Sequence, residues 1–87
     1  MVFTEHVKIR EEKFGAVIFE TLKEKVYVTN ETGKDILAFL KEGNAPNEII
    51  DSLANKYNQD RTFVESDVKD FIESLLKNGL VNNAGSH

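Results

Sequence analysis

The sequence predicts an α+β domain in which a three-stranded antiparallel sheet precedes three helices. Between residues 7 and 30, β-branched and aromatic residues alternate with polar ones or form short apolar runs, as is typical of strands. From residue 31 to Leu80 the apolar residues instead recur every three or four positions, as is typical of helices. A single change of period, rather than an alternation of strands and helices, places the sheet first and the helices after it.

Three strands are predicted, at Val7–Arg10, Phe14–Phe19 and Lys25–Thr29. Charged residues 11–13 fit a tight connection and polar residues 20–24 fit a looser hairpin loop, so the strands form a meander. Gly15, inside the second strand, indicates a bulge or a close approach of another backbone. Residues 1–6 have no clear period and are expected either to fray or to add to a sheet edge.

The first two helices have recognisable ends. Asn30 is a good N-cap for a helix over Glu31–Glu42, and Gly43 is a natural stop. Gly33, in the first turn, indicates tight packing. Asn44 is expected to cap the second helix, with Pro46 in its first turn, and the apolar stripe that follows predicts a buried face: Ile49, Ile50, Leu53, Ala54 and Tyr57.

The third helix is predicted to open with a capping box formed by Thr62 and Glu65, and to end at Asn78–Gly79. Leu80–Val81 is then expected to fold back against the core. The domain is predicted to span residues 1–81, and residues 82–87 are expected to form a polar tail. The apolar stripe of this helix comprises Val64, Val68, Phe71, Ile72, Leu75 and Leu76.

Composition restricts the function. The chain of 87 residues fits one domain, and it contains no cysteine, which excludes disulfides, thiolate metal sites and iron–sulfur ligation. The longest apolar run, Ala16–Phe19, is far too short to cross a membrane, and no secretion signal is recognisable, so a cytoplasmic location is expected. A net charge of −4 disfavours nucleic acid, because phosphate binding depends on clustered Lys and Arg.

Residues suited to catalysis are missing from the pattern. The two histidines, His6 and His87, lie near the chain ends, and neither has a partner at a spacing that builds a nucleophile or a metal site. No glycine motif of the kind that cradles phosphate is present. We therefore expect no catalytic residue, no cofactor and no metal, and the chain is predicted not to be an enzyme.

The strand at Lys25–Thr29 carries functional information. As the last strand of a meander it is an edge, and an edge presents unpaired N–H and C=O groups to another chain. Both of its faces are partly apolar, and only Lys25 and the preceding Glu24 could protect it by charge. Two outcomes stay open: the edge is covered by a helix or by the amino terminus, or it is free for an incoming strand.

In its order and spacing of residues the chain resembles the PqqD-like proteins, which are named for pyrroloquinoline-quinone biosynthesis protein D and are also called RiPP recognition elements. The resemblance covers about Arg10 to Val81. One departure is Thr29, where the family usually has leucine. The residues that carry the resemblance are Arg10, Phe14, Gly15, Val26–Gly33, Ile36, Leu37, Gly43, Pro46, Glu48–Ile50, Leu53, Tyr57, Val64, Asp67, Val68, Phe71, Ile72, Leu75 and Gly79–Val81.

The resemblance implies a winged-helix-like fold and a role in peptide binding. Such a domain binds the leader segment of a ribosomally made precursor peptide as a fourth strand against the third strand, in a groove whose other wall is the third helix. The chain looks like a free-standing adaptor that serves a peptide-modifying enzyme. Partners implied by the family are radical S-adenosylmethionine enzymes, cyclodehydratases, lanthipeptide dehydratases and lasso-peptide leader proteases.

The predicted peptide-binding residues lie on the third strand and the third helix. Tyr27, Val28, Val68 and Phe71 are expected to line the groove, although Val68 and Phe71 could equally be core. Asp67 and Asp70 are expected at the rim, where they would select cationic leader residues. The full predicted set is Lys25, Val26, Tyr27, Val28, Thr29, Val64, Asp67, Val68, Asp70, Phe71 and Leu75.

Two other functions compete with this interpretation. A winged-helix nucleic-acid binder would insert its third helix into the major groove, but that helix carries Glu65, Asp67, Asp70 and Glu73 against only Lys69 and Lys77. A homodimeric scaffold would use the same edge strand for self-association. The chain is accordingly expected to be a monomer or a weak homodimer.

Overall fold

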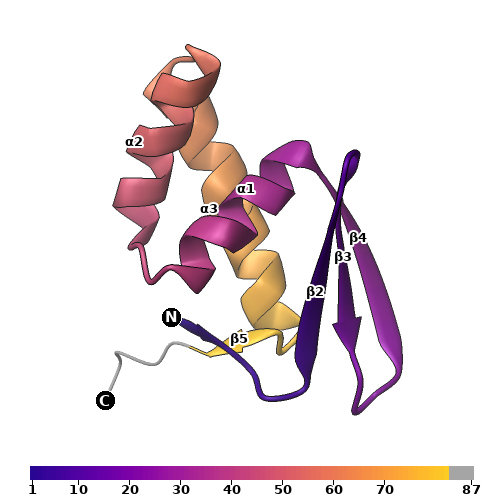
Figure 1. The fold of residues 1–87 in the computed structure, drawn as a ribbon. Coiled ribbons are helices and arrows are strands. Elements are labelled where there is room, and N and C mark those ends of the chain that lie inside the picture. The colour runs from indigo at the N-terminus through magenta and orange to yellow at the C-terminus, as the bar shows by residue number, and fades with distance from the viewer. Residues whose placement is uncertain (83–87) are drawn as a thin grey trace.

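The computed structural model describes residues 1–82 and shows the predicted α+β architecture (Figure 1). A three-stranded sheet is followed by three helices, and a short two-stranded sheet joins the two ends of the chain. The elements are β1 (Val2–Phe3), β2 (Val7–Glu12), β3 (Gly15–Glu20), β4 (Lys25–Asn30), α1 (Glu31–Lys41), α2 (Pro46–Tyr57), α3 (Arg61–Lys77) and β5 (Val81–Asn82).

The main sheet is the predicted meander, with β3 between β2 and β4 and both pairings antiparallel. Ile18 of β3 lies opposite Ile9 of β2 and Tyr27 of β4. Because side chains alternate along a strand, these three share the face that packs on the helices. Ile18 is buried, and Ile9 and Tyr27 are partly buried against the same core.

Gly15 shows why the second strand needs a glycine. A side-chain carbon at this position would lie 1.9 Å from the backbone oxygen of Thr29 and 2.5 Å from the carbonyl carbon of Asn30. The predicted alternative of a close backbone approach is therefore confirmed. It brings the end of β4 against the start of β3, directly before α1 begins.

The first helix has the predicted ends. The N–H of Gly33 donates to Oδ1 of Asn30 at 2.9 Å, which confirms Asn30 as the N-cap. Glu42 is the C-cap, and Gly43 follows with a φ of +91°, a left-handed conformation that favours glycine. Since Asn30 also ends β4, the first turn of α1 is fixed directly beside the edge strand.

The predicted caps of α2 and α3 are wrong. The N-cap of α2 is Ala45 rather than Asn44, because the carboxylate of Glu48 accepts the Ala45 N–H at 2.7 Å and satisfies the helix start without a side chain from the cap. The N-cap of α3 is Asp60, so Thr62 lies inside the first turn. Glu65 pairs with Lys69 at 2.8 Å instead of returning to Thr62.

The chain ends meet in a pairing that the sequence pattern left open. Val2 lies opposite Asn82 and Phe3 opposite Val81, so β1 pairs with β5 and not with the main sheet. Leu80 and Val81 are buried, which confirms that they fold back on the core. Asn82, the first residue of the predicted polar tail, lies in β5, and residues 83–87 lie outside the described residues.

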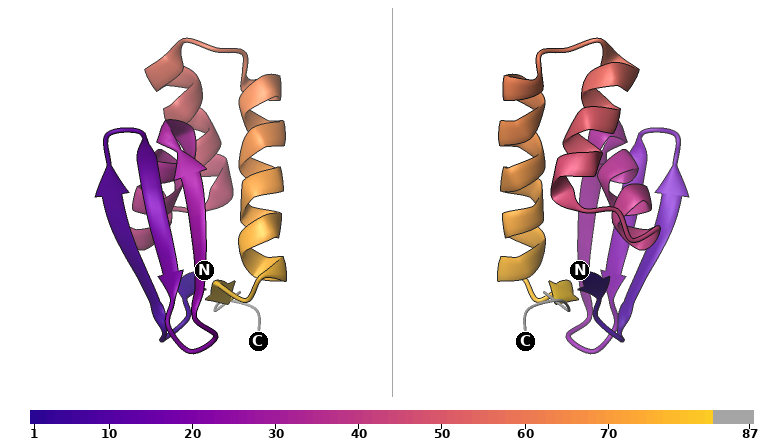
Figure 2. Two further views of the ribbon diagram at one scale, coloured as in Figure 1. Left: turned by 90° about the vertical axis from the view of Figure 1, so that its right-hand side faces the viewer. Right: turned by 90° about the vertical axis from the view of Figure 1, so that its left-hand side faces the viewer.

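One hydrophobic core joins the inner face of the sheet to the three helices. The views in Figure 2 show α3 flanking the β4 side of the sheet, with the β1–β5 pair below it. Within residues 1–82, every helix is too short or too polar to span a lipid bilayer. The largest fully buried side chains are those of Ile36, Leu37, Ile49, Ile50, Leu53, Val68 and Leu80.

Candidate functional site

The free edge of the sheet is β4. Among residues 1–82 its only strand partner is β3, and the amino terminus pairs with β5 instead of covering it. The possibility that the amino terminus covers the edge is thus excluded. A row of main-chain polar groups is left for another strand.

The hydrogen-bond pattern identifies which groups face outward. The N–H of Thr21 donates to the carbonyl of His6 at 2.9 Å, which marks this opposed pair as hydrogen-bonded. Bonded pairs alternate along an antiparallel ladder, so Val17 and Phe19 of β3 bond to β2, and Ile18 bonds to Tyr27 of β4. The N–H and C=O groups of the residues on either side of Tyr27, which are Val26 and Val28, therefore point to the free edge.

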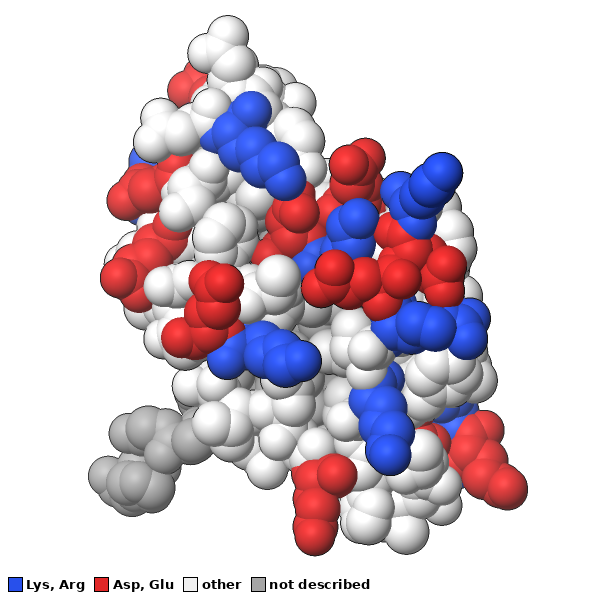
Figure 3. Space-filling model, viewed as in Figure 1, with Lys and Arg blue, Asp and Glu red and all other residues white. Residues whose placement is uncertain are grey.

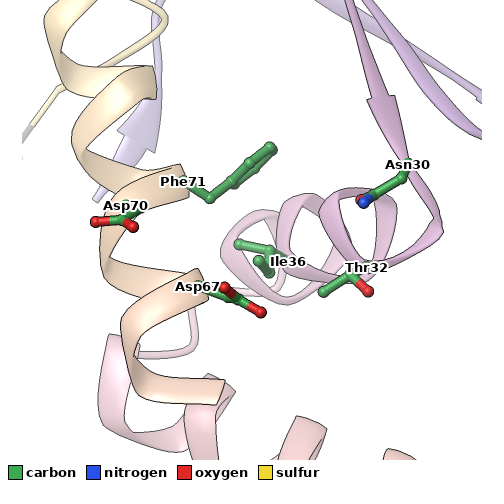
Figure 4. Close-up of a pocket in the computed structure, with 6 residues that line it drawn as sticks. All are labelled: Asn30, Thr32, Ile36, Asp67, Asp70 and Phe71. Atoms are coloured by element: carbon green, nitrogen blue, oxygen red, sulfur yellow. The ribbon is translucent and has the colours of Figure 1, made fainter. Parts of the chain in front are cut away.

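A cavity of about 380 Å³ lies beside the carboxyl end of this edge (Figure 4). Phe71 and Asp67 point into it from α3, toward the start of α1 and the end of β4. The floor is apolar and the rim is polar. The lining residues are Asn30, Thr32, Ile36, Asp67, Asp70 and Phe71.

Gly33 allows α1, β4 and α3 to approach one another at the cavity. A side-chain carbon on Gly33 would lie 1.8 Å from Oγ1 of Thr29 and 3.0 Å from Cε1 of Phe71. The predicted tight packing at this glycine is confirmed. Thr29, the departure from the family pattern, therefore packs its side chain on the backbone of α1, and Phe71 closes the gap from the other side.

Asp67 joins this cavity to two others. It lines a cavity of about 150 Å³ together with Tyr57 and Gln59, and a more open one of about 460 Å³ together with Asp60 and Phe63. Phe63 is 73% exposed, more than the other large apolar side chains of the described residues. The three cavities share Asp67, and we call the surface that they form, from the end of β4 to the start of α3, the path.

The path has an anionic rim. Asp67 and Asp70 are exposed, and neither forms an ion pair within residues 1–82. In contrast, Glu65, which precedes Asp67 by two residues, pairs with Arg61 and Lys69. The carboxylates at the path are thus available to a cationic side chain of a bound chain.

The second cavity is held in place by a polar cluster between α1 and α2. Lys56 contacts Asp35 at 2.9 Å, and the Tyr57 hydroxyl donates to the same carboxylate. Partial burial acts to raise the pKa of Asp35, but the two hydrogen bonds and the Lys56 charge outweigh it and hold that pKa below its ordinary value. The hydrogen bond to Asp35 raises the pKa of Tyr57.

The structure places the predicted site residues in three groups. Phe71, Asp67 and Asp70 line the main cavity, as expected. Val64, Val68 and Leu75 are at most 5% exposed and belong to the core, and Val64 and Val68 also line the cavity of about 150 Å³. The side chains of β4 divide between the two faces of the sheet. Lys25, Tyr27 and Thr29 have the inner-face parity, with Lys25 exposed at the strand end, and Val26 and Val28 are exposed on the outer face.

The expected place of Val28 in the groove needs correction. It lies opposite Val17 and alternates with Tyr27 and Thr29, so its side chain occupies the outer face, while its main chain faces the edge. Val28 is 68% exposed there. A peptide strand in the groove would hydrogen-bond to the main chain of Val28. Only the peptide side chains that point away from the groove would contact the Val28 methyl groups.

Several lining residues were absent from the predicted set. Asn30, Thr32 and Ile36 line the main cavity, because Asn30 ends β4 and caps α1, and Thr32 and Ile36 are one helical turn apart. The four-residue spacing of Thr32 and Ile36, which places both on one face of a helix, could be read from the sequence. Phe63 stood outside the apolar stripe of its helix, a signal of exposure that was also available.

The described residues show no group suited to metal chemistry. Within residues 1–82 no three His, Asp or Glu side chains gather closely enough to hold a metal ion. The site has the form of an apolar slot with a backbone edge and acidic rim.

The fold is shared with solved structures of peptide complexes. A TbiB1 protein solved in complex with the TbiA(beta) leader peptide superposes with a TM-score of 0.87 at 26% identity, covering 95% of this chain and 96% of that one. A lasso peptide synthetase B1 complexed with its leader peptide has a TM-score of 0.84 at 22% identity, covering 92% and 94%, and shows the common fold alone.

Sequence comparison gives the family. No curated protein sequence matches the chain. Residues 5–81 match the family described as coenzyme PQQ synthesis protein D (PqqD), which extends over nearly the whole domain. The chain belongs to the PqqD family.

Proposed function

We propose that this protein is a leader-peptide-binding adaptor. It captures the leader of a ribosomally made precursor as a fourth strand on β4 and presents the precursor to a modifying enzyme. The observation that carries the proposal is the unpaired edge at Val26 and Val28, which lies beside the cavity lined by Phe71. The complexes of the two similar structures with leader peptides support it.

Backbone pairing supplies part of the affinity. The N–H and C=O groups of Val26 and Val28 offer four hydrogen bonds, each contributing about 0.5–1.5 kcal/mol. Association costs about 4–15 kcal/mol, so these bonds alone do not give micromolar binding, which needs about −8 kcal/mol. The remainder comes from leader side chains that bury apolar surface against Phe71 and Tyr27, at about 25 cal/mol per Å².

The acidic rim gives the peptide a preferred charge. Asp67 and Asp70 favour a lysine or arginine in the leader residues that pass the end of β4. The exposed pair contributes mainly to selectivity and association rate, because exposed ion pairs are screened by salt. The peptide-binding residues proposed for this site are Lys25 to Thr29 along the edge, with Asn30, Thr32, Ile36, Asp67, Asp70 and Phe71 around the cavity.

The adaptor performs no bond chemistry in this proposal. Holding the leader raises the effective concentration of the precursor at the active site of the enzyme. A radical S-adenosylmethionine enzyme or a leader protease is the partner class that fits this role. Loss of the adaptor would raise the substrate concentration that the enzyme requires.

A nucleic-acid-binding function is not favoured. The face of the molecule drawn in Figure 3 carries acidic and basic side chains intermixed, and the chain has 15 acidic against 11 basic residues. On α3, the helix that would enter the groove of DNA, Asp67 and Asp70 are exposed beside the cavity. These carboxylates would face phosphates.

The test of the proposal blocks the edge without breaking the sheet. In Val28→Pro, the lost N–H points to solvent, which is the position where an edge strand tolerates proline. Glu11→Pro is the matched control, because by the same alternation the N–H of Glu11 points away from β3 on the opposite edge. The probe is a synthetic peptide selected on the wild-type protein from a displayed library of random 12-residue sequences.

Fluorescence polarisation then compares the three proteins. We expect Val28→Pro to weaken binding at least tenfold and Glu11→Pro to leave it within about twofold, since one lost hydrogen bond and a steric block together exceed about 1.4 kcal/mol. Equal affinities for both variants, or a library that yields no binder, would refute the proposed function.

A further inference from the structure

The outer face of the sheet is apolar next to the free edge. Val26 is 59% exposed and Val28 is 68% exposed, and they lie opposite Phe19 and Val17 of β3. All four side chains point away from the helices, because side chains alternate along a strand. On β3, Val17 and Phe19 alternate with the buried Ala16, Ile18 and Glu20, and the β4 residues opposite each of them share its face. The core therefore does not account for the two exposed valines.

The opposite edge of the same sheet is built differently. On this outer face β2 carries Lys8 opposite Phe19 and Arg10 opposite Val17, and the Arg10 guanidinium lies 5.5 Å from the centre of the Phe19 ring. Charged residues are the usual protection of an edge strand. Thus one edge of the sheet is protected on its outer face, and the edge at Val26 and Val28 is left apolar.

We propose that Val26 and Val28 form a second recognition surface for the bound peptide, and that they select apolar residues at the peptide positions whose side chains point away from the groove. This inference rests on the proposed function. A strand that hydrogen-bonds to the main chain of Val26 and Val28 places side chains beside theirs on the outer face, about 4.5–5.5 Å away between Cβ atoms.

The inference changes the expected peptide pattern. Recognition by the cavity alone requires an apolar residue at every second position, because only the inner face of the added strand meets Phe71 and Tyr27. Recognition on both faces requires consecutive apolar residues where the peptide passes Val26 and Val28. Beyond the valines the strand ends at Asn30, whose side chain caps α1, so the apolar requirement ends there.

The experiment replaces the methyl groups and leaves the edge intact. The displayed library of random 12-residue peptides is selected in parallel on the wild type, on the Val26→Thr/Val28→Thr double variant, and on Leu76→Thr. Threonine keeps the β-branched shape and the strand propensity of valine. Leu76 is a matched control because it is 38% exposed on the other side of α3, among Pro46, Lys69 and Glu73.

We expect consecutive apolar residues in peptides from the wild type and from Leu76→Thr, and apolar residues only at every second position in peptides from the double variant. A wild-type-selected peptide should bind the double variant about tenfold more weakly, since each cross-strand apolar pair contributes about two- to fivefold. An alternating pattern already present on the wild type, with unchanged affinity in the double variant, would overturn the inference and leave the groove function standing.

Failure of the proposed function looks different. It would appear as a library with no binder sensitive to Val28→Pro. Self-association also gives a distinct outcome: if light scattering shows a dimer of the free protein that the double variant abolishes, the two valines belong to an interface between copies, and the inference is overturned.

Discussion

Replacement of Gly33 by alanine tests how the groove is assembled. The new methyl carbon would lie 1.8 Å from Oγ1 of Thr29, 2.9 Å from its Cβ and 3.0 Å from Cε1 of Phe71. Carbon atoms pack at about 3.5–4.0 Å, so the side chain of Thr29 or the ring of Phe71 must retreat. Thr29 is β-branched and fixed on the sheet, which makes its retreat costly.

Two opposing terms set the expected magnitude. Alanine is more favourable than glycine in a helix by about 1 kcal/mol, whereas overpacking costs about 1–3 kcal/mol. Gly33→Ala alone should therefore lower the free energy of unfolding by up to about 2 kcal/mol. With Thr29→Ala, which removes the oxygen at the shortest contact and keeps the Cβ at 2.9 Å, the cost of Gly33→Ala should fall.

Urea denaturation followed by circular dichroism measures all four proteins of this double-mutant cycle. A coupling of at least about 0.5 kcal/mol between the two positions is expected. The reasoning is refuted if Gly33→Ala stabilises the protein by about 1 kcal/mol in both backgrounds, because the first turn of α1 would then not be seated against β4.

Two further predictions concern the support of the site. The pKa of Asp35 is lowered in the fold, so its contribution to stability is complete above the ordinary aspartate pKa of about 3.9 and is lost as the pH falls through the lower folded value. Asp35→Asn should therefore reduce the change of the urea midpoint between pH 5 and pH 2. The same pH dependence in wild type and variant would contradict the assignment. The buried carboxylate of Glu20 accepts hydrogen bonds from the N–H groups of Leu22 and Lys23 at 2.9 and 3.0 Å. Glu20→Ala should therefore lower the free energy of unfolding by about 1–3 kcal/mol in the same urea assay, and a decrease below about 0.5 kcal/mol would show that the β3–β4 turn does not need this carboxylate.

The sequence contained enough information for the main elements of the fold. The change from strand to helical periodicity at Asn30 has a physical cause. The same residue ends β4 in an extended conformation and caps α1 with its side chain. Glycine inside a strand or helix lowers stability, so its presence at Gly15 and Gly33 predicted that a larger side chain would not fit there, and both close contacts are present. The partner atoms of those contacts could not be derived from local pattern.

Short-range signals were less decisive. The β1–β5 pair has two residues in each strand, too few for a period, and it depends on where both chain ends come to lie. Thr62 and Glu65 have the spacing of a capping box, yet the chain reaches α3 from the left-handed Asn58, which starts the helix at Arg61. Tertiary geometry selected Asp60 instead of Thr62 as the N-cap.

The groove shows the same division. The sequence identified the edge strand and α3 as the walls of the groove. Apolar residues occur at both the odd and the even positions of β4, so the pattern could not decide whether Tyr27 or Val28 faces inward. Register across β3 decides it, because Ile18 is buried opposite Tyr27. Asn30 and Thr32 line the cavity because of where α1 packs against β4 and α3, which depends on the tertiary structure.

The central claim is that main-chain groups at Val26 and Val28 receive a peptide strand. Amide hydrogen exchange followed by NMR tests it most directly, with the library-selected peptide as probe. In the free protein the Val26 and Val28 amides should exchange rapidly and that of Tyr27 slowly, and the peptide should slow both valine amides. Valine amides that are already protected without peptide, or that stay fast in the saturated complex, would contradict strand addition at β4.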